Sequence, residues 1–177
     1  MGTPTKPLPA ALVVSVLFAD GSARDEALRL LEGPFGAGEV FPEVFPFDFT
    51  GYYTAEMGAP LRRVLWMAEG LAERDTLAAI KLTTNGIETS LQAPDGRRRV
   101  NIDPGLLTAE NLVLATTKPY SHRVFLRDGI FADLTLVFRD GAFAPLPWTY
   151  PDYSAPALRN ALKTLRSTYI KRLRARE

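Results

Sequence analysis

The stretch His122–Leu146 reads HRVFLRDGIFADLTLVFRDGAFAPL and holds three apolar runs separated by two Asp-Gly dipeptides. Asp-Gly between apolar runs is typical of a two-residue hairpin turn, because both turn residues need a positive φ that Asp and Gly tolerate. The stretch therefore predicts a three-stranded antiparallel meander over residues 122–127, 130–139 and 142–146.

The first hairpin can be given a register. A two-residue turn at Asp128-Gly129 pairs Arg127 with Ile130, Val124 with Asp133 and His122 with Thr135. One face is then apolar and is expected to be core; it holds Phe125, Ala132, Leu134 and Leu136. The other face brings His122, the single histidine, within hydrogen-bonding reach of Asp133.

Two interpretations of the His122–Asp133 pair stay open. An imidazole oriented by a carboxylate suits acid–base catalysis or contact with a phosphate, which makes both residues candidate catalytic groups. The alternative is a cross-strand polar pair on a solvated sheet face, because a pair alone defines no reaction.

The segments before the meander alternate in a recognisable order. A buried strand at 12–18, a helix from 22 to 33, an extended segment at 39–49 and a strand at 60–67 precede a helix at 75–92 and a strand at 98–103. Strand, helix, strand, strand, helix, strand is the order of a ferredoxin-like split βαβ unit. Residues 108–117 are interpreted as a short helix, and a longer helix closes the chain.

The predicted fold class is therefore α+β, with the ferredoxin-like unit followed by the meander and the C-terminal helix. A chain of 177 residues fits one domain, which we place at residues 10–177 after a flexible lead-in at 1–9.

Composition excludes several kinds of site. The chain has no cysteine and one histidine, which excludes disulfides, thiolate metal sites, cysteine nucleophiles and any site that needs two imidazoles from one chain. Its 21 basic and 20 acidic residues nearly balance, so the charge does not favour nucleic acid as the main partner, although it does not exclude it.

No apolar run is long enough to cross a bilayer. The run Leu8–Ala19 is interpreted as a buried strand and not as the core of a signal peptide, since no small-residue cleavage site follows it. The sequence therefore predicts a cytoplasmic protein with no membrane partner, and it does not indicate an oligomeric state.

Polar side chains gather in three places before the meander. Lys81, Asn85 and Glu88 share one face of the 75–92 helix, opposite its apolar stripe. Asn101 and Asp103 share one face at the expected end of the 98–103 strand, where Asp103-Pro104-Gly105 also matches a plain turn. The segment 116–123 is the richest in phosphate-binding donors, and Thr116, Thr117, Lys118 and Arg123 are its candidate ligand-binding residues.

Two further segments combine aromatic and ionisable side chains. Residues 47–56 and 148–153 could each form an aromatic wall of a ligand site, or simply pack into the core. The chain contains neither GxxxxGK[ST] nor GxGxxG, so it has no P-loop and no dinucleotide-binding fingerprint.

These segments, taken in order, resemble the DUF4416 family of uncharacterised prokaryotic proteins. The resemblance spans nearly the whole chain. It is carried by Phe47–Thr50 (FDFT), Ile80–Asn85 (IKLTTN), Asn101–Gly105 (NIDPG), Leu114–Arg123 and Pro147–Tyr153 (PWTYPDY). The resemblance implies no activity, but it implies that these polar residues belong together.

The leading hypothesis is one pocket for a small phosphorylated or otherwise anionic ligand such as a nucleotide. Lys118 and Arg123 would neutralise the ligand, and Asp103 with Glu88 would hold a divalent cation of the Mg²⁺ type, since oxygen ligands suit hard ions. The alternative is a non-catalytic module that binds protein or RNA through residues 148–153 and the basic C-terminal helix.

Overall fold

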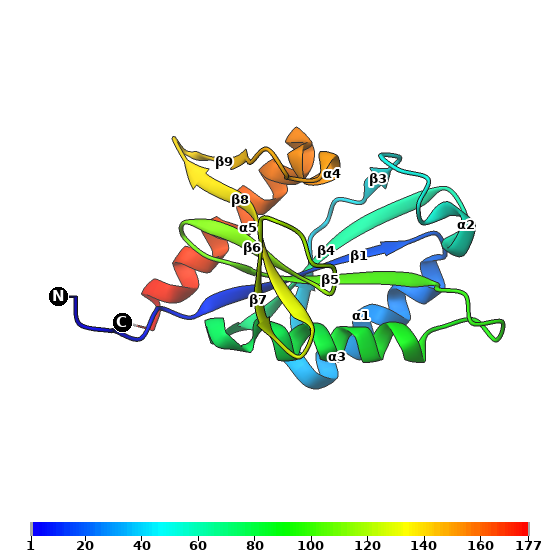
Figure 1. Cartoon of the computed structure of the whole chain (residues 1–177), viewed down its shortest axis with the longest axis horizontal. Helices are drawn as coiled ribbons and strands as arrows, with labels where there is room; N and C mark the ends of the chain where they lie inside the picture. Colours follow the sequence, from blue (N-terminus) through cyan, green and yellow to red (C-terminus); the bar gives the residue numbers. More distant parts are fainter. Residues whose placement is uncertain (1, 177) are drawn as a thin grey trace.

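The computed structural model describes residues 2–176, except for the side chain of Ala55. In this part of the chain, nine strands form one antiparallel sheet in the order β2-β4-β1-β5-β6-β8-β7, with β3 added to β4 and β9 added to β8 (Figure 1). The strands are β1 (Ala10–Phe18), β2 (Gly38–Val40), β3 (Phe45–Phe47), β4 (Leu61–Ala72), β5 (Val100–Leu107), β6 (Asn111–Thr116), β7 (Arg123–Arg127), β8 (Ile130–Arg139) and β9 (Ala142–Pro145).

The helices are α1 (Gly21–Phe35), α2 (Thr54–Met57), α3 (Leu77–Ser90), α4 (Pro151–Ser154) and α5 (Pro156–Arg174), with a 3₁₀ turn η1 at Arg74–Thr76 before α3. Helix α1 begins where the Asp20 carboxylate accepts the Ser22 N–H at 2.9 Å. It ends before Gly36, whose φ of 76° favours glycine.

The ferredoxin-like unit is confirmed. Strands β5, β1, β4 and β2 are neighbours and each pair is antiparallel. The β1–α1–β2 unit is split by β4, and the β4–α3–β5 unit is split by β1. Its second strand is broken into β2 and β3 at the sheet edge, and Pro42, which supplies no N–H for a continuous ladder, lies in the break.

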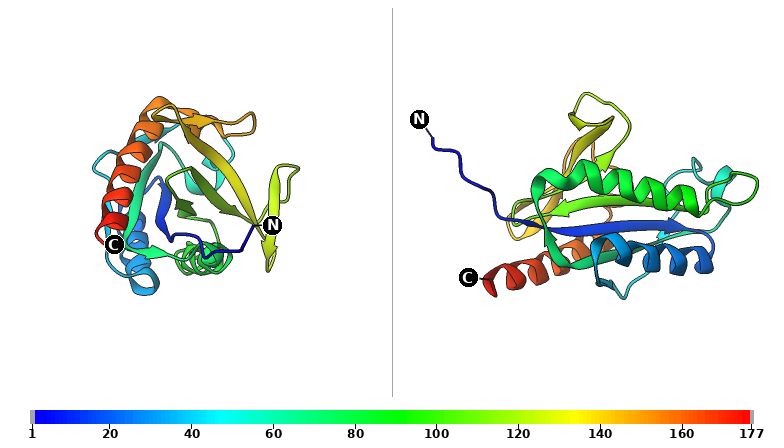
Figure 2. Two further views of the ribbon diagram at one scale, coloured as in Figure 1. Left: turned by 90° about the vertical axis from the view of Figure 1, so that its left-hand side faces the viewer. Right: turned by 90° about the horizontal axis from the view of Figure 1, so that it is seen from below.

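Helices cover both faces of this unit (Figure 2). Alternate residues of β1 divide between them: Val14 and Val16 pack with α1 and α3, whereas Ala11 and Val13 pack with α5. The continuous apolar run of β1 is therefore explained by burial on both sides. Near β3 and α2, a small third cluster forms around Leu17 and Leu61.

Two predicted segments are corrected. Residues 108–117 contain strand β6 and not a helix, because this segment pairs with both β5 and β8. Strand β5 does not end at Asp103; it continues through Pro104 and Gly105 to Leu107. Pro104 is tolerated because β6 pairs with β5 only from Gly105 onward, so Pro104 has one neighbouring strand.

The meander is confirmed, and both Asp-Gly turns have the expected positive φ, with 53° at Asp128 and 76° at Gly129. Arg127 pairs with Ile130 as predicted, but a bulge between Phe125 and Arg127 shifts the rest. Arg123 faces Asp133 and Val124 faces Ala132, so the predicted Val124–Asp133 and His122–Thr135 pairs are wrong. A second bulge lies on β8 at Thr135, which has no partner residue on β6. It interrupts the alternation of β8 side chains between the two faces of the sheet, on which the expected core face depended.

The expected core position of Phe125 is wrong, because residues on both faces of β7 are exposed. Its side chain is 59% exposed, beside Val124 and Leu126, which are also exposed. Strand β7 has β8 on one side and no strand on the other, and it projects from the molecule in the left view of Figure 2.

Candidate functional site

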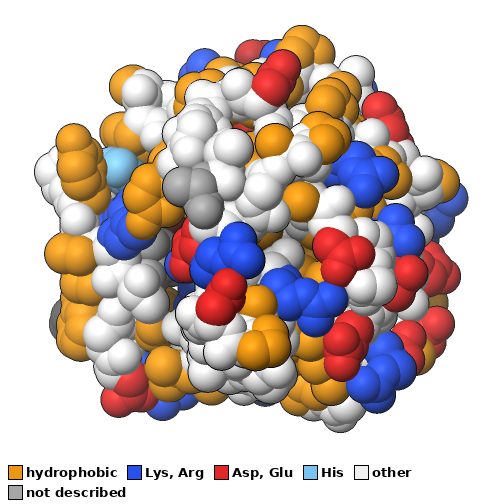
Figure 3. Space-filling view, turned by 90° about the vertical axis from the view of Figure 1, so that its right-hand side faces the viewer, with side chains coloured by type: hydrophobic (Ala, Val, Ile, Leu, Met, Phe, Trp, Pro, Cys, Tyr) orange, Lys and Arg blue, Asp and Glu red, His pale blue; other side chains and the backbone are white. Residues whose placement is uncertain are grey.

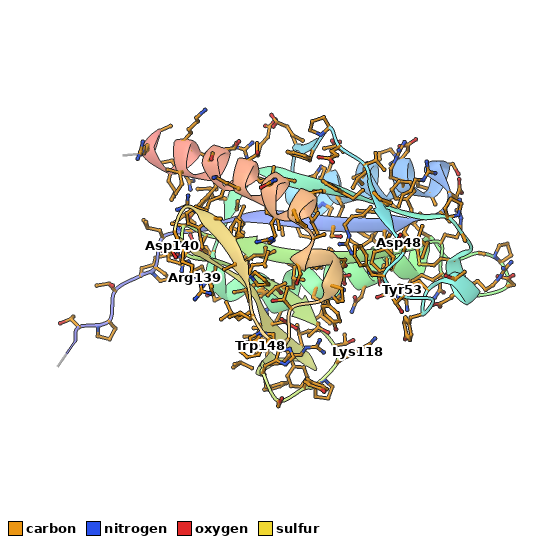
Figure 4. The ribbon with its side chains drawn as sticks, turned by 90° about the horizontal axis from the view of Figure 1, so that it is seen from above. Asp48, Tyr53, Lys118, Arg139, Asp140 and Trp148 are labelled. Carbon is orange, nitrogen blue, oxygen red and sulfur yellow. The ribbon has the colours of Figure 1, made fainter. Side chains whose placement is uncertain are left out.

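A cavity of about 730 Å³ occupies the fork where β5 and β6 diverge. Because the two strands pair only at 105–107 of β5, the edge of β5 at residues 100–104 has no β6 partner. The cavity is bounded by this edge, the polar face of α3, the β3–α2 segment, the β6–β7 connection and α4. Figure 4 shows Tyr53 and Lys118 reaching this region from two separate segments.

Ten of the eleven candidate residues line this one cavity. They are Lys81, Asn85, Glu88, Asn101, Asp103, Thr116, Thr117, Lys118, Arg123 and Asp133. The eleventh, His122, is not among the lining residues. Segments that are distant in sequence thus meet because the sheet places β5, β6 and β8 side by side.

Lys81 and Glu88 complete the free edge of β5. The Lys81 ammonium donates to the Ile102 carbonyl at 2.9 Å, and a Glu88 carboxylate oxygen accepts the Ile102 N–H. These side chains provide the hydrogen bonds that a strand would otherwise provide, and a buried backbone group without a partner is costly. Burial raises the pKa of the Glu88 carboxyl above its usual range, although the nearby Lys81 charge opposes this.

Asp103 offers the cavity a partly exposed carboxylate, as does Glu56, which is paired with Arg98 at 3.7 Å. Asp103 lies on the face of β5 opposite Ile102 and accepts hydrogen bonds from Lys81 at 3.1 Å and from the Asn101 amide. Its side chain is 33% exposed, and that exposed part lines the cavity. Burial acts to raise the pKa of Asp103, but the Lys81 charge and hydrogen bond outweigh it and hold the pKa low, so the carboxylate is ionised.

A buried ion pair on the α4 side was not predicted. The Arg63 guanidinium donates to the Asp152 carboxylate, and the side chains are 6% and 9% exposed. The rings of Phe47 and Tyr153 lie 5.2 and 4.9 Å from the guanidinium carbon. The sequence held a signal for Arg63: in an apolar strand containing Arg62-Arg63, period-two alternation places one arginine on each face, and here Arg63 faces inward.

Arg123 joins three segments and is not a free cation. It donates to Asp133 at 2.9 Å, to the Lys118 carbonyl at 2.9 Å and to the Tyr150 hydroxyl at 2.6 Å. Its side chain is 6% exposed. Arg123 therefore fixes the β6–β7 connection and Tyr150 at the cavity mouth.

Lys118 differs from the other cations of the cavity. Arg63, Lys81, Arg98 and Arg123 each have a carboxylate within 4.0 Å, whereas Lys118 has none in the described part of the chain. Its ammonium lies 4.7 Å from the centre of the Tyr52 ring, across the mouth. The Thr116 hydroxyl accepts a hydrogen bond from the backbone N–H of Lys118 at 3.2 Å and so stabilises the start of the β6–β7 connection.

His122 contacts Asp133 although the predicted register was wrong. Its Nε2 lies 3.3 Å from an Asp133 oxygen that also accepts from Arg123. The ring stacks on Trp148 with centroids 5.0 Å apart and planes inclined by 12°. A catalytic role for the pair stays a prediction.

Among residues 2–176, no three Asp, Glu or His side chains converge as a metal site would require. Asp103 and Glu88 are engaged by Lys81 and by the Ile102 N–H, so a cation between them would have to displace these protein donors. The Mg²⁺ site stays a prediction.

Fold and cavity together define a ferredoxin-like α+β domain extended by a meander, with a polar cavity at the fork of the sheet. The chain belongs to the family described as Domain of unknown function (DUF4416), whose model matches residues 8–169. Neither the curated proteins nor the solved structures contain a match. No helix in the described part of the chain has the length and apolar character to cross a membrane.

Proposed function

We propose that the protein binds a small phosphorylated or otherwise anionic ligand, such as a nucleotide, in the cavity at the β5–β6 fork. The observation that carries the proposal is the charge pairing: four cations of the cavity are paired with carboxylates, whereas Lys118, at the mouth, has no carboxylate partner among the described residues. An ammonium that lines the same cavity as Thr116 and Thr117 is a suitable anion-binding group.

The size of the cavity supports a ligand larger than inorganic phosphate. At about 730 Å³, it lies within the range of small-molecule sites, roughly 300–1,000 Å³. Its walls combine charged groups with the rings of Phe49, Tyr52, Tyr53 and Tyr150. Figure 3 shows basic and acidic side chains intermixed on this end of the molecule, without a large patch of one sign. The pattern favours a compact ligand over a long polyanion.

The test is a thermal-shift screen with nucleotides and other phosphate esters at low salt. A ligand at about 100 times its Kd stabilises a folded protein by about 2.7 kcal/mol, or about 5–11 °C for a domain of this size. Lys118→Ala should lose most of this shift. The matched control is Lys163→Ala on α5, which removes an exposed lysine away from the cavity and should keep it. Equal shifts in both variants would reject the proposal.

The alternative, a protein- or RNA-binding module, has one observation in its favour. Strand β7 exposes Val124 and Phe125 at 67% and 59%, next to an open strand edge. The basic C-terminal helix gives this alternative less support, because two of its arginines are already engaged within the fold. Arg166 donates to the Ala109 carbonyl and Arg172 to the Ala68 carbonyl. Salt-sensitive retention of RNA would favour this alternative.

The proposal concerns binding and assigns no reaction. A cytoplasmic location is part of it and can be checked by fractionating cells that express the chain.

A further inference from the structure

The cavity has a donor end and an acceptor end. The mouth offers the Lys118 ammonium and the hydroxyls of Thr116 and Thr117, which suit an anion. The edge of β5 offers Asp103, whose side chain is 33% exposed, whereas the Asp133 and Asp152 side chains are only 5% and 9% exposed. Glu56, which also lines the cavity and is 39% exposed, is paired with Arg98 at 3.7 Å. A ligand that fills the cavity therefore has to present an anion at one end and hydrogen-bond donors at the other.

The acceptor end is built and not a chance surface group. Asp103 is held from two sides by Lys81 and Asn101, which are 6% and 7% exposed and also line the cavity. A carboxylate oxygen has room for more than one donor, so each Asp103 oxygen can accept another hydrogen bond.

The charge balance decides between two kinds of donor. Lys81 already neutralises Asp103 at 3.1 Å, and Arg63, which is paired with Asp152, lies on the same face of the sheet. A ligand ammonium at Asp103 would bring an additional positive charge close to Lys81, which is unfavourable away from bulk water. Neutral hydroxyl groups carry no such penalty.

Uncharged polar side chains continue this end of the cavity along α3. Asn85 and Thr89 line it from one face of α3, four residues apart, and Gln92 lines it just beyond the end of the helix at Ser90. Amide and hydroxyl groups of this kind can both donate hydrogen bonds to the hydroxyls of a sugar and accept hydrogen bonds from them.

Resting on the proposed function, we infer that the ligand is a phosphate ester of a polyhydroxy compound, with its phosphate at Lys118 and its hydroxyls on Asp103. Two kinds of ligand present this chemistry in the form of a ribose phosphate: a free sugar phosphate and a nucleotide.

The test measures affinity by titration calorimetry for five probes: ribose 5-phosphate, AMP, inorganic phosphate, methyl phosphate and phosphoethanolamine. Ribose 5-phosphate or AMP should bind at least about tenfold more tightly than the last three, since hydrogen bonds to a charged acceptor are among the stronger ones. AMP as the tightest ligand would identify a nucleotide, and ribose 5-phosphate would identify a free sugar phosphate.

A substitution tests whether the tighter binding of hydroxylated phosphate esters depends on Asp103. Asp103→Asn should reduce the advantage of the hydroxylated esters over methyl phosphate to less than about threefold. The control Asp140→Asn lies in the β8–β9 turn, away from Lys118 in Figure 4, and Asn tolerates the positive φ there. It should retain the full advantage. If Asp103→Asn does not fold, the affinities of the unchanged protein for the five probes still test the inference that the ligand is a polyhydroxy phosphate ester.

The two proposals fail differently. If methyl phosphate or inorganic phosphate binds as tightly as ribose 5-phosphate and AMP, in a manner that depends on Lys118, the polyhydroxy inference is overturned and the anion site stands. Tightest binding of phosphoethanolamine would also overturn it. If no probe binds, the proposed function itself is rejected.

Discussion

Removing one partner of the buried Arg63–Asp152 pair should destabilise the fold strongly. Asp152→Asn keeps the shape of the side chain, and its oxygen can still accept the Tyr153 N–H that Asp152 accepts at 2.9 Å. What is lost is the charge opposite a guanidinium that is 6% exposed. An uncompensated buried charge of this kind costs about 3–5 kcal/mol.

The structure favours the lower half of that range. The rings of Phe47 and Tyr153 still face the guanidinium in the variant, and each such contact contributes about 0.5–2 kcal/mol. At roughly 2–4 °C per kcal/mol for a domain of this size, the melting temperature should fall by about 6–16 °C. Urea unfolding followed by circular dichroism measures the loss of stability.

The double variant separates charge from packing. Arg63→Met combined with Asp152→Asn removes both charges of this pair, so the double variant should lose less stability than Asp152→Asn alone. Asp140→Asn, in an exposed turn, is the control and should change stability by less than about 0.5 kcal/mol. A loss below about 1 kcal/mol for Asp152→Asn would show that the pair is solvated and that its charges are not buried.

Two further predictions concern the same cavity. Because burial raises the pKa of Glu88 in the folded state above 4.5, its contribution is favourable at low pH and is lost as pH rises through the folded pKa. Glu88→Gln, which does not titrate, should therefore gain stability relative to the unchanged protein between pH 4 and 8; a constant difference in urea unfolding would contradict this. The Tyr153 hydroxyl is buried without a hydrogen-bond partner among the described residues, so Tyr153→Phe should be neutral or stabilising. A loss above about 1 kcal/mol would indicate a hydrogen bond, with the buried Ser15 hydroxyl as its partner.

Local patterns in the sequence were sufficient for the fold. The Asp-Gly turns fixed the meander because their positive φ is a local requirement of the turn. The strand and helix order was enough for the ferredoxin-like unit, because short connections leave few arrangements of four strands. Residues 108–117 were misread because their periodicity is short and their strand character depends on β5 and β8.

Ten residues named from the sequence line the cavity, but the predicted register of the β7–β8 hairpin was wrong, and a role of these residues in binding stays a prediction. Lys81, Asn101 and Asp103 were named from their faces on a helix and a strand, and those faces are correct. The bulge beside Phe125 has no sequence signal, so the register of His122 was wrong even though its contact with Asp133 is present. The Lys118–Tyr52 contact joins segments that only the tertiary fold brings together.

The most direct measurement is a nitrogen-15 NMR titration of the labelled protein with ribose 5-phosphate, with AMP as a second titrant. The account predicts that chemical-shift changes concentrate on residues 116–118, 101–103 and 85–92, and that Lys118→Ala removes them. Changes concentrated on β7 or α5, or unaffected by Lys118→Ala, would contradict an anion-binding cavity at the β5–β6 fork.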